Sequence, residues 1–153
     1  MPEESLITPA IQALIGVHTP RGRVRINRQL VSRAMETMQD GGLPLPAEGE
    51  VVPGYVLLAG GGGDEPSGSP SFFATTLMVS SEWRFERPLR MGDEFEVTSG
   101  LASVSERLGG RFGHAVYLRN EVHYRDAAGN LAAVTAMTMM QYDARNAPGA
   151  GDD

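Results

Sequence analysis

Residues 111–125 alternate between apolar and polar side chains over fifteen positions. Alternation with a period of two residues predicts a β-strand that has one face against a core. At about 3.3 Å per residue, such a strand reaches roughly 50 Å, which exceeds the usual strand length. A sheet of strands this long must twist and coil, and its concave apolar face needs a cover. The stretch therefore predicts a curved sheet with one buried face.

The core-facing side of this predicted strand carries a histidine. His114 has the same parity as five apolar residues, namely Phe112, Val116, Leu118, Val122 and Tyr124. A histidine there could transfer protons near neutral pH, although a histidine that is hydrogen-bonded within a core is commoner. His123 has the opposite parity and lies among charged residues, so we expect it to be solvated.

Other segments have a strand-like pattern and are bounded by turn residues. Residues 82–87 carry Trp83 and Phe85 on one face, whereas residues 71–79 are ambiguous between helix and strand. We expect the remaining strands at 23–27, 50–59, 94–104 and 131–142, and turns at 88–93, 105–110 and 126–130.

Two segments carry helix signals. Thr8 can cap a short helix over residues 8–16, with Pro9 at the first helical position. Asn27 can cap a second helix over residues 28–39. Its apolar residues recur at helical spacing and are Leu30, Val31, Ala34, Met35 and Met38. Because this is a strong amphipathic helix, we predict an α+β fold in which a curved antiparallel sheet wraps around a helix.

The length of 153 residues fits one domain. We assign residues 1–143 to this domain and residues 144–153 to a flexible tail. Residues 60–70 read GGGGDEPSGSP and predict a mobile loop. No Gly-Lys-Ser/Thr follows the glycines, so the segment does not match a phosphate-binding loop.

Charge and composition argue against several functions. The net charge of −6 and the scattered basic residues disfavour nucleic-acid binding. No apolar segment approaches the roughly 20 residues of a membrane span, and the N-terminus has no apolar signal region. The absence of cysteine fits a cytoplasmic protein. The three histidines lack metal-ligand spacing, so we expect no metal and no cofactor.

The segment 82–93, which reads EWRFERPLRMGD, resembles the MaoC-like dehydratase family. The resemblance extends to Gly110-Arg111-Phe112-Gly113, to residues 11–16 and to Val52-Pro53-Gly54-Tyr55, and it spans about residues 7–142. It is closest to the N-terminal, fatty-acid-synthase-type hot-dog domain of that family. It implies a single hot-dog fold, side-by-side pairing with a second hot-dog subunit or as a homodimer, and an acyl thioester of coenzyme A or acyl carrier protein as ligand.

The same resemblance implies reversible addition of water to a 2-enoyl thioester. Competent members carry an aspartate followed five residues later by a histidine, and this pair performs general acid–base catalysis. Asp40 matches the aspartate, but Leu45 stands where the histidine would be. The chain is therefore expected to be an acyl-thioester-binding, non-catalytic subunit of a heteromeric hydratase or dehydratase.

Two alternatives remain open at this stage. One is an autonomous tailoring dehydratase, isomerase or cyclase of polyketide or secondary metabolism, with Asp40 and His114 as candidate catalytic residues. An aspartate before Gly-Gly is more often structural. The other is a non-enzymatic acyl-thioester binder or assembly module. In every case the candidate substrate-binding residues are Tyr55, Trp83, Phe112 and Gly113, although Trp83 also suits a core.

Overall fold

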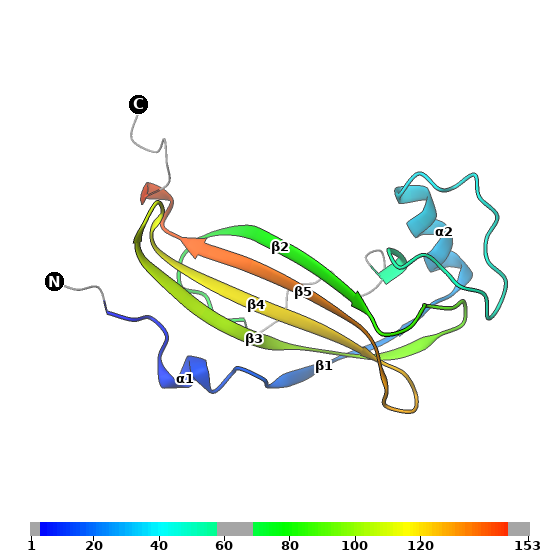
Figure 1. Cartoon of the computed structure of the whole chain (residues 1–153), viewed down its shortest axis with the longest axis horizontal. Helices are drawn as coiled ribbons and strands as arrows, with labels where there is room; N and C mark the ends of the chain where they lie inside the picture. The colour runs from blue at the N-terminus through cyan, green and yellow to red at the C-terminus, as the bar shows by residue number, and fades with distance from the viewer. Residues whose placement is uncertain (1–3, 58–68, 147–153) are drawn as a thin grey trace.

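The long alternating segments pair into a five-stranded, wholly antiparallel sheet in the computed structural model, which describes residues 4–57 and 69–146. The spatial order is β1-β3-β4-β5-β2, and the strands curve along their length (Figure 1). The strands are β1 (His18–Arg25), β2 (Thr75–Phe85), β3 (Glu94–Gly110), β4 (Gly113–Arg125) and β5 (Leu131–Tyr142). The predicted α+β class and curved antiparallel sheet are confirmed.

The alternation in β4 places apolar side chains on the core face of the sheet, as predicted. Val116, Leu118 and Tyr124 are buried on one face. In β3, Leu101 pairs with Asn120 and Ser103 pairs with Arg119, so Ala102 is an unpaired bulge residue. A bulge shifts the parity of the strand by one residue. Odd-numbered β3 residues therefore face the core before the bulge and even-numbered ones face it afterwards.

β3 and β1 both extend beyond their predicted bounds. The turn expected at 105–110 is wrong, because β3 continues to Gly110 and Arg107 still pairs with Ala115. A second irregularity between Arg107 and Gly110 accommodates Gly109, whose φ of 71° favours glycine. β1 begins at His18 rather than at residue 23, and a bulge between Pro20 and Gly22 interrupts its pairing with β3.

The strand predicted at 50–59 is also wrong. Val51 makes one isolated bridge, to Arg90, and a helical turn begins at Val56 and Leu57. Both of these residues are fully buried, so the apolar run reflects burial rather than strand pairing. The ambiguous segment 71–79 joins β2 from Thr75 onward. Residues 58–68, and with them most of the predicted mobile loop, lie outside the described residues, as do residues 147–153 of the tail predicted at 144–153.

The helices begin at the predicted caps. Thr8 caps α1 (Pro9–Gln12), and Asn27 caps α2 (Arg28–Thr37) by accepting a 2.8 Å hydrogen bond from Leu30 N. α2 packs at one end of the sheet (Figure 1) and buries Val31, Ala34 and Met35, whereas Met38 is 50% exposed and does not join this stripe. A 3₁₀ turn, η1 (Ala144–Asn146), follows β5. Within the described ranges, no helix has the length and apolar character needed to cross a membrane.

Two apolar clusters occupy opposite parts of the core face. The main cluster joins α2, the 52–57 segment and the sheet around Phe95 and Tyr124. The satellite cluster contains Leu101, Val116 and Leu118, against which four partly buried residues pack, namely Leu6, Phe72, Phe73 and Val104. The sheet therefore carries two separate apolar surfaces along its length.

Asn27→Ala tests the cap on which the position of α2 depends. Loss of an N-cap side chain leaves a helix donor unpaired, so we expect the free energy of unfolding to fall by about 1 kcal/mol. Thermal unfolding followed by circular dichroism should show a decrease of about 2–4 °C. Gln29→Ala, on the exposed side of the same helical turn, is the matched control. Equal effects of the two substitutions would contradict the assigned cap.

Candidate functional site

The structure brings together two of the predicted site residues, Asp40 and Tyr55. α2 ends at Thr37, and Gln39 adopts a left-handed conformation with φ of 64°, which turns the chain back toward the helix. The backbone N–H of Asp40 then donates to Met35 O at 2.7 Å. In this position Asp40 Oδ2 accepts a 2.7 Å hydrogen bond from the Tyr55 hydroxyl.

This hydrogen bond changes the acid–base behaviour of the phenol. Because Tyr55 donates to the carboxylate of Asp40, and because the ring is also partly desolvated, the pKa of Tyr55 is raised to about 12. The phenol therefore stays protonated at neutral pH and keeps donating. Oδ2 of Asp40 is correspondingly engaged with Tyr55.

Aromatic side chains lie next to this pair. Trp83 and Phe85 on β2 stack with ring centroids 6.3 Å apart, and Trp83 packs against the main cluster, as does Tyr55. Gly54 lies directly under the Phe85 ring, and a Cβ placed at this glycine would be 2.8 Å from Phe85 Cζ. Only glycine fits this approach without displacing the ring. Tyr55 and Trp83 thus belong to one region of the fold.

His114 lies at the other end of the sheet. It is ten residues along β4 from Tyr124, which the main cluster contains, and this corresponds to roughly 33 Å of strand. Asp40 and His114 therefore do not form an acid–base pair within one chain. His114 Nε2 is instead 2.8 Å from Glu106 Oε2, and Phe73 packs edge-on against the imidazole at 5.8 Å. The histidine side chain is only 11% exposed.

Glu106 connects this histidine to the N-terminal segment. Its carboxylate accepts hydrogen bonds from the Ser5 hydroxyl and, at 3.1 Å, from Leu6 N. The hydrogen bond from Ser5 contributes most to lowering the pKa of Glu106, and those from His114 and Leu6 act in the same direction. The N-terminal segment is thereby held against the satellite cluster. The sequence interpretation missed Glu106 because it assigned residues 105–110 to a turn.

The remaining predicted substrate-binding residues, Phe112 and Gly113, lie near His114 at the β3–β4 hairpin. Phe112 packs against Tyr142 with ring centroids 5.0 Å apart. Gly113 has φ of 69°, and a Cβ there would be 2.8 Å from the side chain of Asn146. The four residues predicted to bind substrate therefore divide into two groups: Tyr55 with Trp83, and Phe112 with Gly113.

A small pocket of about 210 Å³ lies between these ends, on the core side of the sheet. Ser99, one of its lining residues, is buried and accepts a 2.6 Å hydrogen bond from Arg21 Nε. Asn120 supplies a further polar side chain, and Leu14 and Val17 supply apolar ones. The combination suits a ligand with one polar group and an apolar remainder.

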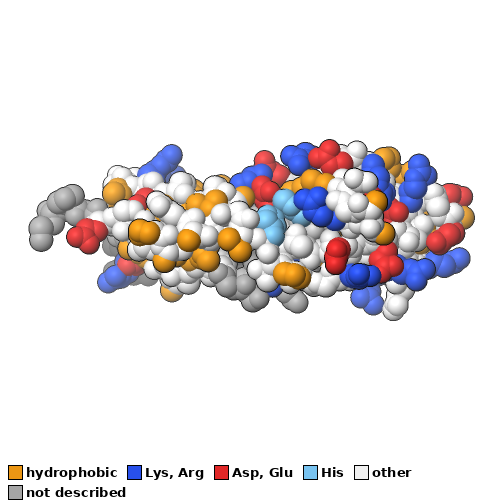
Figure 2. Space-filling model, turned by 90° about the horizontal axis from the view of Figure 1, so that it is seen from below, with side chains coloured by type: hydrophobic (Ala, Val, Ile, Leu, Met, Phe, Trp, Pro, Cys, Tyr) orange, Lys and Arg blue, Asp and Glu red, His pale blue; other side chains and the backbone are white. Residues whose placement is uncertain are grey.

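The other two histidines form a pair. The rings of His18 and His123 are 4.3 Å apart, and His123 Nε2 is 3.0 Å from Glu121 Oε1, so the expectation that His123 is simply solvated is wrong. Burial lowers the pKa of His18, and repulsion from His123 adds to this effect. On the face shown in Figure 2, histidine side chains lie between an apolar region and a charged region. No group of three potential metal ligands occurs among the residues that the structure describes.

No protein-family model matches the sequence, and no curated protein sequence matches it. Solved structures do resemble it. A chain of the ChsH1–ChsH2 complex from Mycobacterium tuberculosis aligns with a TM-score of 0.64 and 15% identity, over 82% of this chain and 88% of that one. A chain of HadBC, a 3R-hydroxyacyl-ACP dehydratase complex from the same organism, gives 0.54 and 16%, over 83% and 96%.

A MaoC-like dehydratase from Rhodospirillum rubrum aligns with a TM-score of 0.54 and 13% identity, over 84% of this chain and 92% of that one. At sequence identities this low, the structural alignments indicate a common fold only. The activity has to be inferred from the residues of this chain.

Glu106→Gln tests the link between the N-terminal segment and the sheet. The lowered pKa means that the ionised form is favoured in the folded state, so its stabilisation is present above about pH 4.5 and is lost as the pH falls through the folded pKa. At pH 7 we expect the variant to be less stable by about 1 kcal/mol. Thermal melts from pH 7 to pH 3 should show this difference shrinking toward low pH. Glu50→Gln, at an exposed carboxylate, should show no such trend, and a pH-independent difference for Glu106→Gln would contradict the assignment.

Proposed function

Because the chain has the hot-dog fold of the MaoC-like dehydratases, we propose that it is an acyl-thioester-binding subunit of a two-chain 2-enoyl-thioester hydratase or 3-hydroxyacyl-thioester dehydratase. In this proposal the partner subunit supplies the acid–base pair that adds or removes water. This chain contributes part of the acyl-binding surface and holds the partner in place. The acyl group is carried by coenzyme A or by an acyl carrier protein.

The observation that carries the proposal is the environment of Asp40. Its Oδ2 is hydrogen-bonded to Tyr55, and Leu45, where the resemblance calls for a histidine, has a hydrocarbon side chain that is 36% exposed. A hydrocarbon side chain cannot accept or donate the proton that water addition requires. His114 is too far along the sheet to replace the missing imidazole. The loop after α2 therefore lacks half of the acid–base pair.

Acyl binding is supported by the aromatic region beside Tyr55. Trp83 and Phe85 present stacked rings on the side of the sheet that carries the main cluster, and Phe85 is 39% exposed. Apolar walls with a few polar groups are typical of sites for acyl ligands. The Tyr55 phenol, which stays protonated, adds a polar group to this wall.

The outer edge of β2 is the proposed contact with the partner. β2 pairs with β5 on one side only among the described strands, and three consecutive apolar residues on it, Leu77, Met78 and Val79, are 48%, 55% and 51% exposed. Unpaired strand edges with apolar side chains favour pairing with another chain. Two of the similar structures, ChsH1–ChsH2 and HadBC, are complexes of two different chains, which fits this arrangement.

Hydration of crotonyl-coenzyme A, followed by the loss of absorbance of the enoyl thioester, tests the proposal. The purified chain alone should show no turnover, whereas coexpression with a hot-dog protein encoded beside it should yield an active complex. In that complex, Asp40→Asn and His114→Gln should each leave kcat within about threefold of the unmodified complex. Loss of an acid–base catalyst lowers rates by about 10²–10⁴-fold. Such a loss would place a catalytic group on this chain and contradict its non-catalytic role, whereas normal turnover by the chain alone would favour an autonomous enzyme.

Leu77→Lys tests the partner contact. A charge on the β2 edge must be desolvated if that edge pairs with another strand, so the dissociation constant of the complex should rise at least tenfold. Analytical ultracentrifugation or titration calorimetry measures this change. Leu108→Lys, at a similarly exposed leucine on β3, should leave association unaltered. Equal weakening by both substitutions would argue against the β2 edge.

A further inference from the structure

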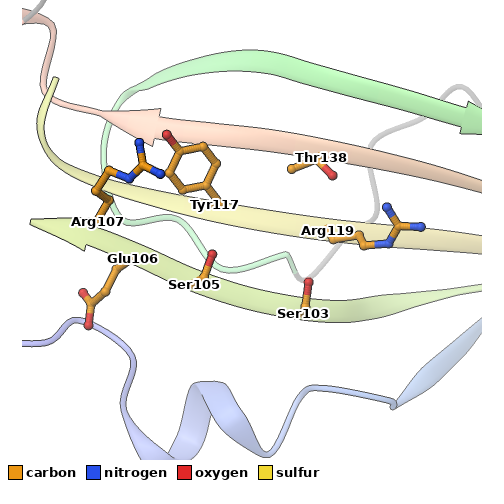
Figure 3. A pocket seen from close by; sticks show the side chains of 7 residues that line it. All are labelled: Ser103, Ser105, Glu106, Arg107, Tyr117, Arg119 and Thr138. Carbon is orange, nitrogen blue, oxygen red and sulfur yellow. The ribbon is translucent and has the colours of Figure 1, made fainter. Parts of the chain in front are cut away.

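The face of the sheet opposite the core carries a polar pocket that the proposed function does not use. Its volume is about 370 Å³, and six of its side chains come from β3, β4 and β5 (Figure 3). They are Ser103, Ser105, Arg107, Tyr117, Arg119 and Thr138. Glu106 also borders the pocket, but its carboxylate lies on the core side with His114.

The strand register arranges these side chains in rows. Ser105 lies opposite Tyr117, and Arg119 lies between Ser103 and Thr138. Arg107 is four residues beyond Ser103 on β3, which separates the two ends of the pocket by about 13 Å. Figure 3 shows the Arg107 guanidinium beside the Tyr117 ring and Arg119 at the opposite end.

The two arginines of the pocket differ in whether an acidic side chain neutralises their charge. Arg119 is paired with Glu82 and with Glu121, so its charge is compensated. Arg107 makes no ion pair and no side-chain hydrogen bond with any residue in ranges 4–57 and 69–146. The positive charge of the pocket is therefore concentrated at the Arg107 end. Since the whole chain carries a net charge of −6, this is a local feature rather than part of a basic surface.

The hydroxyl groups in the pocket are similarly available. The side chains of Ser103, Ser105, Tyr117 and Thr138 make no hydrogen bond to another described side chain or backbone group. Four hydroxyls and one guanidinium thus line the same pocket without partners among the described residues. Hydroxyls can donate or accept, whereas the guanidinium only donates.

We propose that this pocket binds a phosphate monoester with a small hydroxylated organic group. The phosphate would lie at the Arg107 end, where a guanidinium and the Ser105 and Tyr117 hydroxyls supply donors from two strands. Three terminal phosphate oxygens can use donors arriving from several directions, and arginine matches phosphate geometry well. The organic group would lie toward Ser103 and Thr138, where Glu82 and Glu121 disfavour a second anion.

Titration calorimetry of the full chain with glycerol 3-phosphate tests this inference. We expect saturable binding of glycerol 3-phosphate, weaker binding of inorganic phosphate, and none of glycerol. Arg107→Gln should raise the dissociation constant at least tenfold, and Ser105→Ala by about threefold to tenfold. Arg111→Gln, which changes an exposed arginine of the same hairpin outside the pocket, should alter it less than twofold.

Several results would overturn the proposal. Absence of binding by the unmodified chain would refute the proposed site. Equal loss of affinity in Arg107→Gln and Arg111→Gln would show that general charge attraction, and not the pocket, accounts for the binding. Glycerate binding as tightly as glycerol 3-phosphate would refute the preference for phosphate. Amide shifts of Ser105 and Thr138 on addition of glycerol 3-phosphate, recorded by NMR, would locate the ligand independently of any substitution. Unchanged shifts at both residues would place it elsewhere and refute the site.

Discussion

One unpaired residue in β3 determines what each face of the sheet can carry. Because Ala102 is a bulge, the parity of β3 changes there, and Leu101 and Val104 face the same side although they are three residues apart. The same change directs Glu106 toward His114 and directs Ser103, Ser105 and Arg107 to the opposite face. A shift of one residue exchanges the two faces of a strand. The satellite cluster, the Glu106–His114 contact and the polar pocket therefore all depend on this bulge.

Much of the fold could be predicted from the sequence because alternation and capping are local signals. The faces of β4, the caps at Thr8 and Asn27 and the strand at 131–142 follow from neighbouring residues alone. The end of β3 does not, because Gly109 and Gly110 are as compatible with a bulged hairpin as with a turn. The strand predicted at 50–59 was wrong for a different reason. A short apolar run indicates burial and does not distinguish a strand from a helical turn.

In the candidate site, too, some features could be predicted from the sequence and others depend on the three-dimensional fold. The leucine at position 45 is visible in the sequence, and its inability to transfer a proton needs no coordinates. The hydrogen bond between Asp40 and Tyr55 depends on how the loop between them folds, which no periodic pattern encodes. The contact between Glu106 and His114 requires the hairpin register, and the separation of His114 from Asp40 requires the whole length of β4. Long-range geometry, rather than residue type, decides which of these groups can act together.

The two edges of the sheet differ in how well they can accept another strand. In β1, Pro20 has no backbone N–H to offer, and the bulge at Arg21 interrupts the regular spacing of donors and acceptors. β2 has no proline, although it too has a register irregularity next to Val79. A molecule with one receptive edge and one blocked edge joins a single neighbour and then stops. The proline and the bulge in β1 thus disfavour the addition of strands at that edge, and this limits the growth of such a long, apolar-rich sheet into fibres.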